Sequence, residues 1–159
     1  MTQLLEYHEK LVNRLGEATA EFRTACLAIA KPYDPIEPGG WSAHQVAVHT
    51  RDIDQLVYGA RARRTLAEND PAFPNFDGET YMIQHYDPKE SLPALLDGLV
   101  ASVRSLMQLL LQMPPGGWSR ESSHETQGGG LTLQTWVERG LEHIEEHLET
   151  VQKAAKKSA

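Results

Sequence analysis

The chain has 159 residues, the length of one domain, and its 40 % apolar and 23 % charged residues are a globular balance, not a disordered one. The net charge of −7 argues against a nucleic-acid partner, because phosphate backbones bind basic surfaces. A single cysteine cannot form an internal disulfide, so packing or a metal ion must stabilise the fold.

The sequence predicts a cytoplasmic protein without a membrane segment. Its uninterrupted apolar runs are only a few residues long, shorter than a membrane-spanning helix requires. Glu6, Glu9 and Glu17 interrupt the region where a secretory signal would need an apolar stretch. Together with the lone cysteine, these features favour a reducing compartment.

Four stretches repeat apolar residues with helical periodicity and none shows clear strand alternation, which predicts an all-α, four-helix bundle as one domain over residues 1–159. We expect helices over about residues 2–30, 42–68, 88–113 and 131–153. Proline and glycine clusters, which cannot continue a helix, separate these stretches.

The start of the second helix carries the clearest local signal. Ser42 is a favourable N-cap residue and Gln45 stands three positions later, the spacing of a capping box. Trp41 is expected to pack onto Val46 as a hydrophobic staple. Thr132 is the expected N-cap of the fourth helix.

Two connections are longer than a bundle needs. Residues 69–87 are aromatic-rich and predict a short helix around residues 79–85, while residues 114–130 are rich in glycine and serine. Such loops either cap a functional site or are plain crossover connections, and the sequence leaves both readings open.

Helical phase separates the histidines. At about 100° per residue, His49 falls inside the apolar stripe of the second helix, whereas His44 points to its opposite, polar side. His143 and His147 are four residues apart on the fourth helix, one row beside its apolar stripe. The far face of that helix carries the acids Glu138, Glu142, Glu145 and Glu149.

The three histidines His49, His143 and His147 therefore predict a metal site. Two imidazoles at i and i+4 can converge on one cation, and a third from another helix leaves coordination positions open for water or substrate, as in catalytic sites. The motif H-x-E-E-H lacks the glutamate that zinc proteases place directly after the first histidine, so a protease is disfavoured.

Simpler interpretations remain open for each residue. His49 alone would more often be a hydrogen-bonded core histidine, and a lone H-x-x-x-H on a helix is common by chance. His8 is expected to be structural. Cys26 could neighbour the site, but a small buried apolar role fits it better. Glu146 could orient the ring of His143, although it is more often a solvated acid.

The chain resembles the DinB superfamily over nearly its whole length. The resemblance is carried by Gly40-Trp41-Ser42 followed by His49, by the closing pair His143 and His147, and by residues 77–86. It implies a bundle of up-up-down-down type with a long crossover between helices two and three. It also implies a homodimer and a divalent ion, zinc or nickel, held at the three histidine positions.

Characterised relatives of this kind include thiol-dependent transferases and isomerases, which use mycothiol, bacillithiol or glutathione, and some hydrolases. Some isomerase relatives carry glutamate at the position of His143, so this chain gives no support to that reaction. Arg51, Arg61, Arg63 and Arg64 could supply a basic pocket for an acidic thiol. Arg64 shares the side of His49 but lies about four turns away, too far for contact.

Three functional hypotheses follow. The first is a metal-dependent enzyme, a thiol S-transferase or hydrolase that acts on a small molecule. The second is a non-catalytic, stress-related metal-binding module. The third is a bundle without metal that pairs with another chain through an apolar surface.

Overall fold

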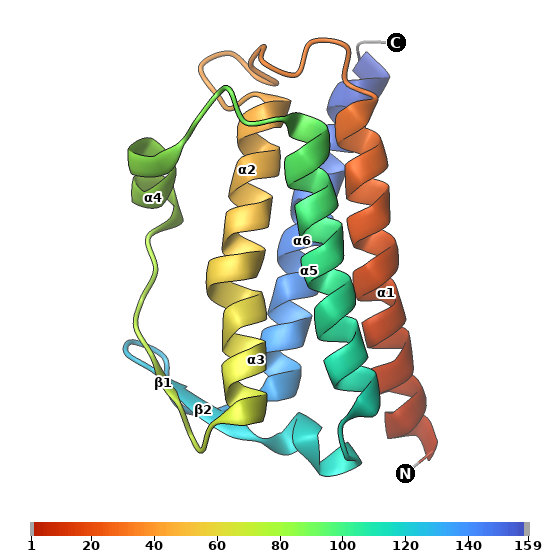
Figure 1. Cartoon of the computed structure of the whole chain (residues 1–159), viewed down its shortest axis with the longest axis vertical. Coiled ribbons are helices and arrows are strands. Elements are labelled where there is room, and N and C mark those ends of the chain that lie inside the picture. The colour runs from red at the N-terminus through yellow and green to blue at the C-terminus, as the bar shows by residue number, and fades with distance from the viewer. Residues whose placement is uncertain (1, 158–159) are drawn as a thin grey trace.

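The computed structural model describes residues 2–157. They form four long helical rods, some of which run parallel and others antiparallel to one another (Figure 1). The rods are α1 (Thr2–Leu27), the segment from α2 (Ala43–Ile53) to α3 (Gly59–Ala67), α5 (Leu92–Gln112) and α6 (Leu133–Lys157). The expected all-α four-helix bundle is therefore confirmed.

Cross-helix contacts give the direction of each rod. Tyr7 contacts Glu138 and Arg14 contacts Glu145, so α1 and α6 run parallel. Arg23 on α1 contacts Asp97 on α5, whereas Gly16 faces Met107, so these two helices are antiparallel. With the chain direction in Figure 1, the order is up-down-down-up, a cyclic permutation of the expected up-up-down-down order.

α1 packs mainly against α5 and α6, while α2 and α3 pack against the other sides of the same two helices. α1 and the α2–α3 rod thus lie across the bundle from one another. The core between them is built from apolar residues of all four rods, among them Leu15, Phe22, Ala47, Leu96, Leu99, Leu133, Trp136 and Ile144.

The helix boundaries follow from local chemistry. Ser42 accepts a hydrogen bond from the backbone N–H of Gln45 (3.1 Å) and the Gln45 side chain accepts one from the N–H of Ser42 (2.9 Å), which completes the predicted capping box. Thr132 caps α6 by accepting from the N–H of Thr135 (3.2 Å). α1 ends three residues earlier than expected, since a residue that precedes proline disfavours helix and Pro32 follows shortly.

The second rod differs from the expected continuous helix, because residues Asp54–Tyr58 form a π-helical turn, η1. The N–H of Gly59 donates to the carbonyl of Asp54, five residues back instead of four. A methyl group on Gly59 would lie 2.5 Å from that carbonyl oxygen, so the wide turn requires glycine at this position.

The two long connections also contain three short strands, which the sequence pattern did not indicate. β1 (Ala72–Phe73) pairs in parallel with β2 (Glu121–His124), and β2 pairs antiparallel with β3 (Gly128–Thr132). This small sheet joins the two long connections at one end of the bundle (Figure 1). The first connection also contains α4 (Gly78–His85), close to the expected short helix, and the second contains the 3-10 turn η2 (Pro115–Ser119).

By length and composition alone, α5 is long and apolar enough to cross a membrane. The sequence had predicted no helix of this kind. Its apolar face, including Leu95, Leu99, Val103 and Leu106, is buried in the bundle. Core helices of soluble proteins can have the same length and apolar composition.

Candidate metal centre

The rings of His49, His143 and His147 converge between α2 and α6. The Nε2 atom of His143 lies 3.2 Å from Nε2 of His49 and 3.1 Å from Nε2 of His147. One nitrogen from each ring lies within 4.8 Å of the others. The structure therefore brings together the three residues that the sequence singled out, although they come from segments almost a hundred positions apart.

The spacing of the nitrogens fits a single divalent ion. Two ligand nitrogens at 2.0–2.1 Å from a tetrahedral zinc ion are about 3.3 Å apart, close to the two separations observed. All three donors are imidazole nitrogens, which suit zinc and nickel among other transition metals. A set of three leaves at least one tetrahedral position free.

Burial keeps the triad neutral, the state in which an imidazole can bind a metal. Burial, and next the charge of neighbouring His147, lowers the pKa of His49 to about 4. The same two causes, in the same order, lower the pKa of His143 to about 3, with a smaller effect from His49. Burial also lowers the pKa of His147, while the negative charge of Glu146 opposes this shift.

Neighbouring segments hold the rings in place. Trp41, which the sequence assigned to a staple on Val46, lies with its ring 4.9 Å from the ring of His49. A methyl group on Gly78 would come within 3.2 Å of the His49 ring, so the segment before α4 lies close over this histidine. Tyr58 of η1 lies 5.8 Å from His143, ring to ring.

Metal-binding histidines usually donate their second ring nitrogen to a partner that fixes the ring. In this site the Nδ1 atom of His49 is buried without a hydrogen-bond partner. Glu146 forms no hydrogen bond with His143 among the contacts of residues 2–157, and its charge acts on His147 instead. Glu146 is exposed, in agreement with the solvated acid that the sequence favoured over an orienting role on His143.

The triad lies in a cleft of about 700 Å³, which we call the triad cleft. One wall is the rod from α2 to α3, the other is α6, and residues 75–79 together with His124 and Gln127 form the rim. The π turn shapes this cleft. In a regular helix Arg61 would lie about 120° around the axis from His49, but the extra residue of the wide turn reduces this angle to about 20°.

The rotation explains why Arg61 lines the cleft together with His49. Arg64, which the sequence already placed too far along the helix for contact with His49, forms an exposed ion pair with Glu68 (2.7 Å). The rotation also accounts for Leu56. Leu56, placed by regular phase on the buried stripe, is 45 % exposed.

Two other histidines, His44 and His8, and the cysteine lie outside the triad cleft. His44, which was expected on the polar side of its helix, is fully buried. Hydrogen bonds with the Tyr86 hydroxyl and the Glu90 carbonyl, both at 2.7 Å, satisfy its Nδ1 and Nε2 atoms. His8 stacks on Trp118, as expected for a structural residue. Cys26 is buried outside the triad cleft, and burial raises its pKa to about 12, which makes it an unreactive thiol.

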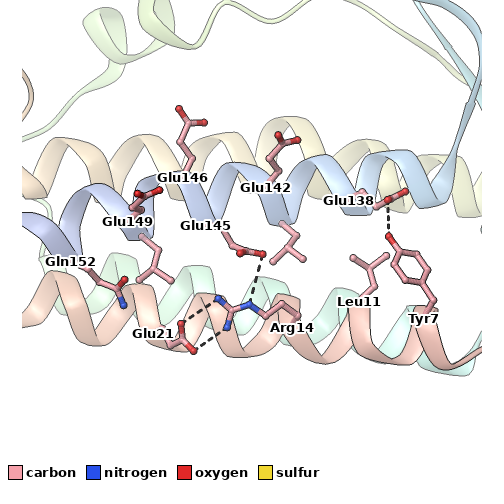
Figure 2. A pocket seen from close by; sticks show the side chains of 12 residues that line it. Tyr7, Leu11, Arg14, Glu21, Glu138, Glu142, Glu145, Glu146, Glu149 and Gln152 are labelled. Carbon is pink, nitrogen blue, oxygen red and sulfur yellow. Dashed lines mark hydrogen bonds and ion pairs between the residues drawn. The ribbon is translucent and has the colours of Figure 1, made fainter.

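A second groove, between α1 and α6, is lined by the acids that the sequence placed on the far face of α6 (Figure 2). Some of its charged groups form contacts within the groove. Arg14 contacts Glu21 and Glu145, and Tyr7 donates to Glu138 (2.7 Å). The triad is not among the residues that line it, so we place the functional site in the triad cleft.

Comparison with known proteins agrees with this architecture. The model of the DinB superfamily matches residues 1–151. Among solved structures, the chain is similar to YfiT from Bacillus subtilis, described as a probable metal-dependent hydrolase with an unusual four-helix bundle topology. The two are 20 % identical with a TM-score of 0.85, over 96 % of this chain and 88 % of YfiT, a likeness of fold. None of the curated proteins compared with the chain matches it.

Proposed function

The chain belongs to the DinB superfamily, and we propose that it is a metal-dependent enzyme whose His49, His143 and His147 hold one divalent ion, zinc or nickel. The observation that carries this proposal is the convergence of three neutral imidazoles on the wall of an open cleft, with Nε2 of His143 at 3.1–3.2 Å from Nε2 of each of the other two. A bound ion would lower the pKa of a water molecule or a thiol and so supply a nucleophile near neutral pH.

The chain's own residues would position the reaction. The histidines are held neutral by burial, so no proton has to leave them before the ion binds. Glu146 is an exposed carboxylate on the cleft wall whose charge reaches the triad, and we assign it the role of accepting the proton of the nucleophile.

Hydrolysis of a small molecule is the reaction that the comparison favours, since YfiT is described as a probable metal-dependent hydrolase. Thiol transfer is the second candidate, because a ligand set with an open position serves a thiol as well as a water. The two are separated by whether turnover of a test electrophile requires an added low-molecular-weight thiol.

The experiment is elemental analysis of protein purified without a histidine tag. We expect about one zinc or nickel ion per chain, and less than a tenth of that in His49→Ala. His85→Ala removes an exposed histidine of α4 outside the cleft and should keep the ion. Wild-type protein that remains metal-free after incubation with either ion would refute the proposal.

The same variant separates catalysis from a purely structural ion. If His49→Ala stays folded, with a melting temperature close to that of the wild type, but loses activity, the ion is catalytic. If it unfolds, the ion stabilises the bundle and the non-catalytic, stress-related module becomes the better description.

A further inference from the structure

The end of the triad cleft away from the histidines contains a buried arginine without an acidic partner. Arg61 is 8 % exposed, and its guanidinium lies 4.8 Å from the ring of Trp136. It donates to the carbonyl of Pro74 (3.0 Å), and no carboxylate within residues 2–157 forms an ion pair with it. A guanidinium has five N–H donors, and burying its charge without an anion is costly.

The donors of Arg61 that lack a protein partner are open to the cleft. The side-chain atoms that are both sealed from solvent and unpartnered belong, among the described residues, to His49, Asp54 and Thr65. Arg61 is not one of them, yet it lines the cleft. A group inside the cleft can therefore reach its guanidinium.

Two neighbouring side chains also present donors at this end. The Nδ1 atom of His124 accepts a hydrogen bond from the N–H of Thr126 (3.1 Å), so the neutral ring carries its proton on Nε2. Gln127 accepts from Arg139 through Oε1, which leaves its amide N–H₂ as a donor. Both residues line the cleft. The ring of His124 lies 6.4 Å from that of Trp136, and Arg139, the donor to Gln127, lies 5.3 Å from the same ring, which also faces Arg61.

The charges of the cleft are segregated. The acids that line it are Asp77, Glu79 and Glu146, which flank the triad end, where Gly78 lies over His49. The nearby acid at the Arg61 end, Glu125, accepts from the backbone N–H of Asn75 (2.9 Å) and does not line the cleft. One end thus suits a cation and the other an anion.

We propose that the Arg61 end of the triad cleft binds an oxyanion of the substrate, a carboxylate or phosphate group, through Arg61 with His124 and Gln127. Trp136, beneath Arg61, precedes His143 by seven residues of α6, which places the anion site about 10 Å from the triad. As a statement about substrate, this inference rests on the proposed function. The substrate is then an anionic molecule whose reacting bond lies about 10 Å from its charged group.

The test measures anion binding by ¹⁵N-labelled protein from which metal has been removed by a chelator. Inorganic phosphate and acetate are titrated separately at constant ionic strength, while the indole N–H signal of Trp136, assigned with Trp136→Phe, is followed by NMR. We expect a saturable shift with a dissociation constant on the order of 1–10 mM. The stronger of the two anions identifies the oxyanion.

Arg61→Gln is expected to weaken binding at least tenfold, because it removes the charge and the planar fork. Arg64→Gln is the matched control, since Arg64 lies on the same helix, is exposed and does not line the cleft, and its affinity should stay within twofold of wild type. Arg61→Lys keeps charge and stem if Arg61→Gln fails to fold, and should bind at least threefold more weakly.

The inference would be overturned by any of three results. The shift could be absent or non-saturable, it could occur at Trp41 beside His49 instead of at Trp136, or the wild type and the folded Arg61 variant could bind the anion with equal affinity. Because the measurement is made without metal, its failure leaves the metal analysis standing. Failure of metal binding likewise leaves the anion result standing.

Discussion

Proton competition at the triad should be weak, and this can be measured. Three ordinary imidazoles with a pKa near 6.5 would each lose about 30-fold in metal affinity on acidification from pH 7.5 to 5, or about 30,000-fold together. In this structure burial lowers the pKa of His49 to about 4 and of His143 to about 3. At pH 5 both therefore remain almost fully deprotonated.

His147 is then the one ligand for which a proton can still compete, and its pKa is also lowered by burial. We expect zinc affinity to fall by no more than about 30-fold between pH 7.5 and 5, and to fall steeply below pH 4 as His49 protonates. The assay is competition with a chromophoric chelator whose own pH dependence is known. Circular dichroism at pH 5 verifies that the metal-free protein remains folded.

A loss of more than about a thousandfold at pH 5 would mean that at least two of the rings titrate as exposed imidazoles. That result would contradict the burial of the triad. Metal binding itself could still hold, because a solvated set of three histidines also coordinates zinc.

Three further predictions concern the second rod and its N-cap, with a glycine variant of α5 as a control. Gly59→Ala should lower the free energy of unfolding by about 1–3 kcal/mol, because the added methyl group meets the Asp54 carbonyl. Gly98→Ala, whose methyl group would meet no atom within 4 Å, should raise the free energy of unfolding by up to about 1 kcal/mol. Urea denaturation measures both. Ser42→Ala should cost about 1 kcal/mol by the same assay, and an unchanged midpoint would show that the capping box adds nothing. Burial raises the pKa of Asp54 to about 6, above its value in the unfolded chain. Between pH 4 and 6 the folded protein therefore keeps a proton that the unfolded chain releases, so the free energy of unfolding falls as pH rises through this range. Asp54→Asn should therefore be more stable than wild type at pH 8, by up to about 3 kcal/mol, and nearly equal at pH 4 in thermal unfolding.

The sequence was sufficient where a residue's role depends on local spacing. The capping box at Ser42 follows from residues three positions apart, and the pair His143 and His147 from one helical turn. His49 could be added because it precedes the π turn, where regular helical phase still holds. The convergence of the three rings was therefore predictable, while their binding of an ion stays a prediction.

The sequence was insufficient where one residue alters the helical phase or where a distant segment covers a side chain. The wide turn at Asp54–Tyr58 carries no periodic signal, so the sequence could not single out Arg61 from the other arginines of this helix as the one that lines the cleft. His44 is buried by Tyr86 and Glu90, which follow it by more than forty residues. The strands are two to five residues long, too short for alternation to stand out.

Because of the π turn, a one-residue change in the length of this helix would move one end of the cleft relative to the other. Deleting one residue between positions 54 and 58 would restore regular pitch and swing everything from Gly59 to Ala67 by about a quarter turn, while His49 upstream stays in place. An indel of one residue, with no change of a cleft-lining side chain, would then exchange the group opposite Trp136. Relatives that share the histidines but differ by one residue in this helix should therefore differ in the charge that they accept.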